Sequence, residues 1–269
     1  MKWGLLAAVL LLAMPTAPAA PGTPGDAWTQ PARYAFEYRV DLQPVHVGNT
    51  QRLRLWVPYP AVTPNQRVLS AQIDSPWAYQ LTRDRLGNRI LYMAGTGAPP
   101  TPLVMRFTIE RWPSRGIPNS AIAPGSPLSP EHYRAAPRLI PLAPLIRRIA
   151  EREGRGLHTS QEKVRAFYDY VVRNMRYDKH GKGWGRGDAI WACTHKHGNC
   201  TDFHSLFIGL ALTQEIPARF VIGFPIPLDR DDGTIPGYHC WAEYYDQERG
   251  WVPLDSSEGK RSGNPDAYF

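Results

Sequence analysis

Alternation of apolar and polar side chains is the clearest pattern in the first half of the chain. In such a run successive side chains point to opposite faces of a strand, so one face meets a core and the other meets solvent. Proline, glycine and asparagine separate the runs, as is typical of a small antiparallel β-sandwich. The pattern therefore predicts a β-rich domain over residues 34–112. The alternating runs are residues 34–40, 51–57, 87–92 and 103–112.

The spacing of apolar residues changes after residues 113–136. This stretch is rich in proline and predicts a linker or surface arm between two domains. Beyond it, apolar residues at helical spacing predict one helix from about residue 143 and a second helix after Thr159. Thr159 and Glu162 have the spacing of a capping box, which marks a helix start. Residues 137–269 are therefore assigned to a second domain that mixes helices with strands.

Two strands, at residues 239–245 and 250–255, flank a polar turn and predict a β-hairpin. If this hairpin is centred on Gln247, His239 and Asp255 face each other on one side of the ribbon. Directly opposed residues have Cβ atoms about 5 Å apart, which suits a carboxylate that orients an imidazole. A slip of one residue would move the two side chains to opposite faces.

Apolar positions also distinguish the two faces of this hairpin. Trp241 and Trp251 share the face of His239 and are expected to wall a substrate cleft. The other hairpin face is expected to be core and carries Cys240, Ala242, Tyr244, Val252 and Leu254.

A buried strand is expected at residues 220–224. Arg219, which precedes it, is expected either to pair with a core carboxylate or to remain solvated.

A thiol stands at the start of another helical pattern. Asn199 is a good N-cap, so Cys200 is expected in the first turn of a helix. The positive end of the helix dipole lowers the pKa of a thiol from about 8.5 and favours the reactive thiolate. A cysteine alone is more often a buried structural residue. Together with an imidazole at His239 and a carboxylate at Asp255, however, Cys200 completes a set that activates a sulfur nucleophile.

Four separated blocks around these residues resemble the transglutaminase-like superfamily in its bacterial branch: GNCTDFHSLF, IPARFVIGF, GYHCWAEYY and GWVPLD, in that order. The resemblance covers about residues 160–260 and implies a papain-like α+β core, with helices packed on an antiparallel sheet. It implies that Cys200 is the nucleophile, His239 the base and Asp255 the orienting acid. It does not imply protein crosslinking, since members include peptidases, amidases and deamidases. The β-rich region resembles, more weakly, the N-terminal region of bacterial members.

A glycine-rich loop at residues 181–187 lacks the Gly-Lys-Ser/Thr ending of a phosphate loop. Trp184 in this loop is expected either at the substrate cleft or in an exposed connector. Family members place a side-chain donor upstream of the cysteine to complete an oxyanion hole, and Trp184 and Trp191 are the candidates. The backbone N–H of Cys200 is the safer donor.

Three cysteines leave two arrangements open. Either Cys193 pairs with Cys240 and Cys200 stays free, or all the thiols are free. Cys193, His195, His197 and Cys200 also raise the alternative of a zinc site, since these residue types are zinc ligands. Residues 193, 195 and 197 alternate along the chain while Cys200 begins a helix, so the four side chains are not assured to point toward one ion. We therefore expect no metal and no cofactor.

Residues 1–19 have the features of a cleavable secretion signal. Lys2 precedes an apolar stretch, and the small residues that follow predict cleavage after Ala19. Residues 20–33 are then a linker, and the protein is expected in the periplasm or secreted. An uncleaved anchor is the alternative, and membrane association is otherwise expected only through export.

Composition narrows the function classes. The chain has 43% hydrophobic residues and a formal net charge of +7, which is typical of a basic globular protein. Its basic residues are scattered and no nucleic-acid motif is present, so no nucleic-acid partner is expected. Anionic envelope polymers are possible partners of a basic exported protein, although simple solubility explains the charge equally.

Together with the resemblance, these patterns predict an exported bacterial enzyme: a cysteine peptidase, amidase or transglutaminase-like acyltransferase. Its substrate would be a protein, peptide or peptidoglycan-like amide, attacked by Cys200 to form a thioester. The alternative is a catalytically silent binding or scaffold module of the envelope that keeps the fold. Bacterial members often continue with further strands, so either a C-terminally truncated member or a fragment of a longer protein is expected. Substrate, acyl acceptor and oligomeric state are not predicted.

Overall fold

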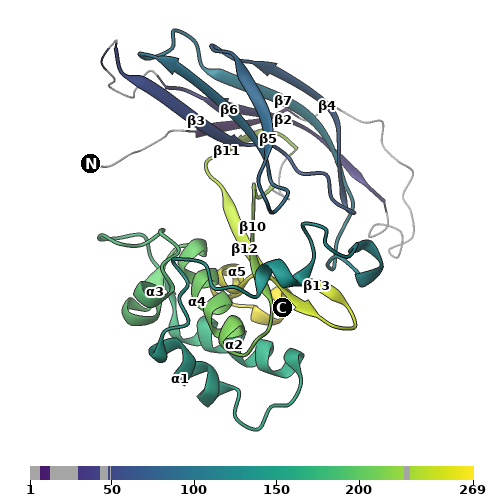
Figure 1. The fold of residues 1–269 in the computed structure, drawn as a ribbon, viewed down its shortest axis with the longest axis vertical. Coiled ribbons are helices and arrows are strands. Elements are labelled where there is room, and N and C mark those ends of the chain that lie inside the picture. The colour runs from purple at the N-terminus through teal and green to yellow at the C-terminus, as the bar shows by residue number, and fades with distance from the viewer. Residues whose placement is uncertain (1–6, 13–29, 43–47, 49, 227–230) are drawn as a thin grey trace. The chain divides into compact units, whose positions relative to one another are not determined.

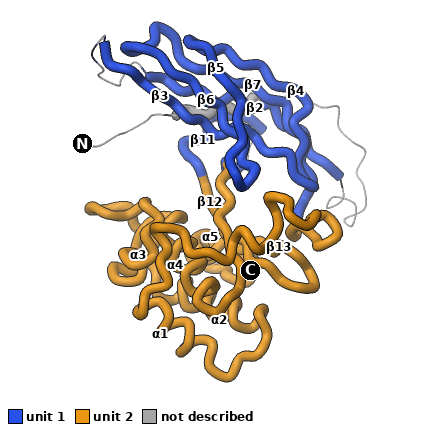
Figure 2. The backbone as a smooth tube through the Cα atoms, viewed as in Figure 1, with its two compact units in different colours: residues 1–114, 224–238 blue, residues 115–223, 239–269 orange. Residues whose placement is uncertain are grey.

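The computed structural model describes residues 7–12, 30–42, 48, 50–226 and 231–269, with backbone only for the first of these segments. The chain divides into two compact units (Figure 2). One unit contains residues 1–114 and 224–238, and the other contains residues 115–223 and 239–269. The segment 224–238, which the sequence pattern assigns to the second domain, therefore belongs with the β-rich unit.

The β-rich unit is built from two antiparallel sheets (Figure 1). One has the strand order β11-β1-β2-β7-β4 and the other has the order β3-β6-β5. Side chains from both sheets bury one shared cluster that includes Leu91, Met93 and Met105, as expected for a sandwich. The strands are β1 (Ala7–Leu12), β2 (Ala32–Val40), β3 (Arg52–Pro58), β4 (Gln66–Asp74), β5 (Tyr79–Arg83), β6 (Arg89–Thr96), β7 (Leu103–Arg111) and β11 (Gly233–Ile235).

Strand β1 falls within residues 1–19, the segment expected to be a secretion signal. Its backbone pairs with β2 on one side and with β11 on the other. The expected cleavage point after Ala19 lies outside the described residues. The signal peptide therefore stays a prediction.

The second unit packs helices against a three-stranded antiparallel sheet of order β10-β12-β13. This is the α+β architecture that the sequence predicts. The capping box of Thr159 and Glu162 is present at the start of α2, as predicted. The elements are α1 (Pro144–Glu153), α2 (Ser160–Asn174), β8 (Arg176–Tyr177), α3 (Ala189–His195), β9 (His197–Gly198), α4 (Cys200–Thr213), β10 (Ala218–Gly223), β12 (His239–Asp246), β13 (Gly250–Leu254) and α5 (Ser256–Ser262).

Helix α4 is the centre of this unit. The helices α1, α2, α3 and α5 all contact it, as do strands β10 and β12. Its apolar residues Phe203, Leu206 and Leu210 are fully buried, which confirms the predicted stripe. Because neighbours surround the helix, Asp202 and His204 are fully buried as well. Burial of polar side chains is costly unless they are hydrogen-bonded, so these two residues require partners.

The register of the β12–β13 hairpin differs from the prediction. Ala242 pairs with Leu254 and Asp246 pairs with Gly250, so the hairpin is centred one residue later than Gln247. The two strands are therefore displaced by two residues, which preserves the face of every side chain because the strand period is two. The predicted core face is confirmed, since Ala242, Tyr244 and Leu254 are buried in the helical core.

Trp251 does not wall a cleft, and this prediction is wrong. The proline-rich stretch, which the sequence assigned to a linker or surface arm, packs on the hairpin, and the indole is fully buried. Ile117 forms a β-bridge with Trp251, and the indole N–H donates to the Leu128 carbonyl at 2.7 Å. The ring of Tyr133 meets the indole edge-on. Trp251 is thus a core residue that attaches the proline-rich stretch to the sheet.

Arg219 pairs with a core carboxylate, one of its two predicted fates. Its Nε and Nη2 atoms both donate to Glu243 Oε2, at 2.9 and 2.7 Å. The guanidinium also lies 4.6 Å from the centre of the Trp251 ring. The two charged side chains are only 11% and 10% exposed, so neither is well solvated.

Glu243→Ala should therefore lower the free energy of unfolding by about 3 kcal/mol, because it leaves a buried guanidinium without its counter-charge. Urea denaturation followed by circular dichroism measures the change. Glu248→Ala, an exposed change in the turn of the same hairpin, is the control and should shift stability by less than about 0.5 kcal/mol. Equal effects of the two variants would show that the ion pair contributes nothing specific.

Candidate active site

The N-terminus of α4 is built to hold Cys200 in its first turn, as predicted. The Asn199 side chain accepts the backbone N–H of Thr201 at 3.0 Å. In return, Asp202 Oδ2 accepts the backbone N–H of Asn199 at 3.0 Å and completes a capping box. Cys200 is 3% exposed, so the residue is almost completely buried.

Asp202 also ties the glycine-rich loop to this helix start. Its Oδ2 accepts the Gly185 N–H at 2.6 Å, and the Gly187 N–H donates to the same carboxylate. The approach is close: a Cβ on Gly198, whose φ is +149°, would lie 2.2 Å from Asp202 Oδ2. Burial raises the pKa of Asp202, although these backbone hydrogen bonds oppose the shift. The loop is thus bound to the start of α4 through one carboxylate.

His239 and Asp255 meet directly despite the shifted register. His239 Nε2 lies 2.5 Å from Asp255 Oδ2. Asp255 follows the last residue of β13 and also caps α5, where its Oδ1 accepts the N–H groups of Ser257 and Glu258 at 3.1 and 2.9 Å. The helix start therefore stabilises the charged carboxylate. Since Nε2 faces Asp255, the other ring nitrogen of His239 faces Cys200, to which the ring is hydrogen-bonded.

The electrostatics of the three groups favour a charged pair. Burial disfavours a charged imidazole, but the hydrogen bonds with Asp255 and Cys200 outweigh it and raise the pKa of His239 to about 10. Hydrogen bonding by Cys240 lowers the pKa of the Cys200 thiol, burial opposes this, and His239 lowers it further. Burial likewise opposes ionisation of Asp255, yet contacts with His204 and His239 lower its pKa below the usual range. Near neutral pH the site therefore holds a thiolate beside an imidazolium.

Cys200, Cys193 and Cys240 are all free and buried. The Cys193–Cys240 disulfide, one of the two arrangements that the sequence leaves open, is therefore not formed, and the alternative of free thiols describes this structure. Cys193 lies 4.0 Å from Lys196 Nζ on α3. Cys240 instead contacts the Cys200 sulfur. The strand face that places Cys240 in the core also places it against the first turn of α4.

Sequence reasoning missed two residues at this site. His204, one turn beyond Cys200, is fully buried, and its Nε2 lies 3.4 Å from Asp255 Oδ1. Its only signal was its spacing on α4, on the same side as Cys200. Tyr177, from β8, accepts a hydrogen bond from the Cys200 backbone, while burial raises the pKa of the phenol to about 12. No pattern in the sequence connects Tyr177 with Cys200, because strand pairing to β9 brings them together.

The aromatic residues expected around the site have different environments. Trp241 is half-buried, with its ring 6.5 Å from that of His239. Trp184 is half-buried in the glycine-rich loop. Trp191 stacks on His195 with ring centres 4.6 Å apart, and His197 meets the same indole edge-on. Within the described ranges, no group of three or more His, Cys, Asp or Glu side chains is arranged to hold a metal ion.

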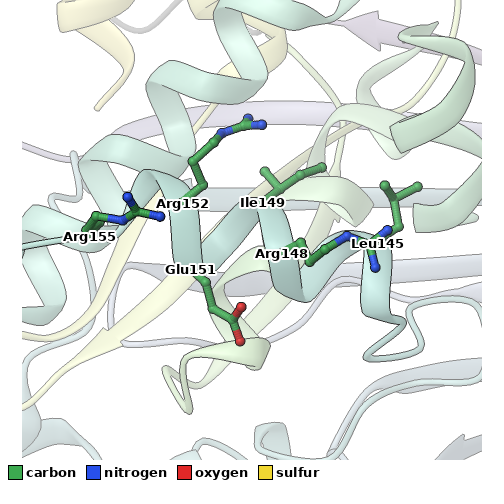
Figure 3. A pocket seen from close by; sticks show the side chains of 6 residues that line it. All are labelled: Leu145, Arg148, Ile149, Glu151, Arg152 and Arg155. Atoms are coloured by element: carbon green, nitrogen blue, oxygen red, sulfur yellow. The ribbon is translucent and has the colours of Figure 1, made fainter.

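Two surface hollows lie in this unit. The first, of about 420 Å³, is lined only by α1 and the turn after it, including Arg148, Arg152 and Arg155, and contains none of Cys200, His239 and Asp255 (Figure 3). The second, of about 350 Å³, is lined in part by Arg186 and Gly187 of the glycine-rich loop and by Thr201, the neighbour of Cys200. The second hollow is therefore the one that lies at the start of α4, beside Cys200.

Comparison with known sequences places a family domain over this site. Residues 147–256 match the profile of the transglutaminase-like superfamily. An uncharacterised protein of Haemophilus influenzae is 25% identical over 254 residues, which span 84% of this chain and 69% of that protein.

In the part of the chain that the structure describes, no helix is long and apolar enough to cross a membrane.

Solved structures share the fold. A candidate cysteine protease from Cytophaga hutchinsonii superposes with a TM-score of 0.62 at 17% identity, covering 93% of this chain and 76% of that one. The periplasmic domain of TgpA from Pseudomonas aeruginosa superposes with a TM-score of 0.51 at 16% identity, covering 98% and 93%. At these identities the likeness extends to the fold.

Asp202→Ala tests the attachment of the glycine-rich loop. Without the carboxylate, the N–H groups of Gly185 and Gly187 lose their acceptor, so their amide hydrogen exchange should become at least about tenfold faster. Hydrogen-exchange mass spectrometry of residues 183–187 measures this. Asp202→Asn keeps one acceptor oxygen and should show a smaller change; unaltered exchange in the alanine variant would mean that other contacts hold the loop.

Proposed function

Because residues 147–256 form a domain of the transglutaminase-like superfamily, we propose that this chain is an exported, thiol-dependent acyl-transfer enzyme that acts on amide bonds. The observation that supports this most strongly is His239 placed between Cys200 and Asp255, with the 2.5 Å contact to Asp255 on one ring nitrogen. This is the arrangement that a thiol nucleophile, its acid–base partner and an orienting carboxylate require.

The proposed reaction begins with attack of the Cys200 thiolate on an amide carbonyl. A carbon–sulfur bond forms, and the imidazolium of His239 gives its proton to the leaving nitrogen as the carbon–nitrogen bond breaks. A thioester on Cys200 remains. His239, now neutral, takes a proton from water or from an amine, which attacks the thioester and returns the electron pair to sulfur. Asp255 stabilises the imidazolium and holds the ring in orientation throughout.

The developing oxyanion needs a donor close to the nucleophile. The Cys200 backbone N–H is the proposed donor, as in an oxyanion hole at a helix start. In the free protein this N–H is bonded to the Tyr177 hydroxyl. A substrate carbonyl oxygen would therefore replace the hydroxyl at that N–H. Trp184 and Trp241 remain proposed cleft residues, whereas Trp251 is excluded by its burial.

The substrate we propose is a protein, peptide or peptidoglycan-like amide in the periplasm or outside the cell. The fold shared with a periplasmic domain of TgpA and the secretion signal predicted at residues 1–19 both support export. The basic charge of the chain favours anionic polymers. Water and an amine are both admissible acyl acceptors, because the same three groups serve either one.

Alkylation of Cys200 tests the charged pair. The rate of reaction with chloroacetamide should have a pH midpoint well below about 8.5, because the thiolate persists at low pH beside the imidazolium. In His239→Ala the positive partner is lost, and the midpoint should rise toward about 8.5. Peptide-resolved mass spectrometry assigns the label to Cys200. An ordinary midpoint that His239→Ala leaves unchanged would instead favour a catalytically silent binding module.

Turnover gives a second test. Against a set of peptide amides, Cys200→Ser should lower kcat/KM at least about a thousandfold, because serine lacks the acidity of the thiol. Cys193→Ser removes a buried thiol of the same unit and should leave turnover within about twofold. For the parent protein, kcat/KM should rise with pH as Cys200 ionises and fall near pH 10 as His239 loses its proton. Retained turnover in Cys200→Ser would exclude Cys200 as the nucleophile.

A further inference from the structure

The hollow beside Cys200 combines apolar walls with positive charge. It has a volume of about 350 Å³, and its apolar lining includes the buried Ile140 and the half-buried Phe220. Arg138 and Arg186 line it from two segments that lie far apart in the chain, and among the described residues no Asp or Glu lines it. A ligand that matches this lining carries an apolar stem and a negative charge.

Neither of these arginines is committed to another group. Both are exposed, and within the ranges that the structure describes neither guanidinium has an ion pair or a hydrogen bond. The hollow on α1 differs, because Glu151 lines it and its Arg152 is paired with Glu153 at 2.8 Å (Figure 3). Positive charge is therefore available to a ligand in the hollow beside Cys200, whereas it is partly compensated in the hollow on α1.

The segment that carries Arg138 is attached to the core. The Leu139 carbonyl accepts the Ala189 N–H at 2.9 Å, which joins the segment to the start of α3. Ile140 belongs to the helical core and packs closely on α4, since a Cβ on Gly209 would lie 3.3 Å from Ile140 Cγ2. These contacts fix the backbone at Arg138 relative to α4.

The glycine-rich loop fixes the backbone at Arg186 in a similar way. The N–H of Gly185 donates to Asp202 Oδ2 at 2.6 Å. On the other side of Arg186, Gly187 has a φ of +70°, and a Cβ there would lie 3.1 Å from Thr201 Cγ2. The loop backbone therefore lies directly against the first turn of α4. Two arginines on fixed backbones lose little backbone freedom when a ligand binds, which favours affinity.

We propose that this hollow is a specificity subsite that binds a carboxylate of the substrate, and that Arg138 and Arg186 select it. The inference rests on the proposed function, because it names the substrate class of an enzyme whose nucleophile is Cys200. A guanidinium group offers a carboxylate two parallel N–H donors, and the apolar walls suit the methylene stem of a glutamate-like residue. The substrate class is thus an acidic peptide amide, whose carboxylate belongs to a side chain or to a chain end near the attacked bond.

Irreversible probes test the subsite in the full chain. Chloroacetyl-Gly-Glu amide and chloroacetyl-Gly-Gln amide have nearly the same shape and differ by one charge. With either probe the Cys200 thiolate displaces chloride and forms a thioether. At low ionic strength and low probe concentration, the glutamate probe should react about tenfold faster. The gain should come from a lower half-saturation concentration at an unchanged limiting rate, because the charge acts in binding and not in the bond that forms.

Variants assign this preference to the two arginines. Arg138→Ala and Arg186→Ala should each lower it about threefold, the size expected of one exposed ion pair, and the double variant should abolish it. Arg138→Lys and Arg186→Lys keep the charge and should retain part of the preference. Arg148→Ala is the control, since it removes the same charge from the hollow on α1 and should leave the preference unchanged. Added salt should weaken the preference in the parent protein.

Two further probes distinguish the sources of the carboxylate and the reach. Chloroacetyl-Gly-Gln with a free C-terminus carries its charge at the chain end rather than on a side chain. A preference for it over the amide that depends on both arginines would assign the subsite to a terminal carboxylate. A second glycine lengthens each probe by about 3.5 Å, so the absence of a preference at both lengths would not be a matter of reach.

The outcomes separate this inference from the proposed function. Equal reaction of charged and neutral probes at both lengths would overturn the subsite, as would a preference that survives the double variant. A loss in Arg148→Ala as large as in Arg186→Ala would also overturn it, since net charge alone would then explain the effect. The proposed function is judged instead by the pH midpoint of Cys200 alkylation and its rise in His239→Ala, which do not depend on the ratio between probes.

Discussion

The Asp255 carboxylate is the group on which the geometry of the candidate site depends. One of its oxygens contacts His239, and the other accepts the backbone N–H groups that open α5. A buried carboxylate is costly unless it is fully hydrogen-bonded, and here a helix start, an imidazole and His204 supply its partners. The same contacts that stabilise the charge therefore fix where the strand ends, where α5 begins and how the His239 ring is turned.

The burial of helix α4 is the second constraint on the geometry of the candidate site. It is surrounded by four helices and a sheet, so every polar side chain near its N-terminus must find a partner inside the protein. Asp202 binds the helix start and the glycine-rich loop at once, and His204 lies between Ser256 and Cys240. The burial that stabilises the helical core thus also orders the groups around Cys200, and it places the thiol where burial alone would suppress its ionisation.

Local signals in the sequence predicted local structure well. Thr159 with Glu162, and Asn199 before Cys200, mark helix starts because a cap needs only residues within one turn of each other. The centre of the β12–β13 hairpin lies one residue later than predicted, in a turn where Asp246 Oδ1 accepts the N–H groups of Glu248 and Arg249. This shift displaces the strands by two residues, so each side chain remains on its predicted face, since the strand period is two. The two indoles on that face have different environments. Trp241 is half-buried, whereas Trp251 contacts a stretch more than a hundred residues earlier in the chain and is buried.

The sequence by itself determined the α+β core, the β-rich region before it, the capped start of α4 and the three residue types that meet in the site. These follow from periodicity and capping, which act over a few residues, and from the family resemblance that four short blocks carry. Tertiary structure alone decided the contacts between distant segments: the enclosure of Trp251, the Tyr177 hydroxyl at the Cys200 backbone, the free Cys240 beside Cys200, and His204 beside Asp255. Each of these contacts joins segments that are distant in the chain. The free energy of each contact depends on which polar groups are buried away from water when the core packs.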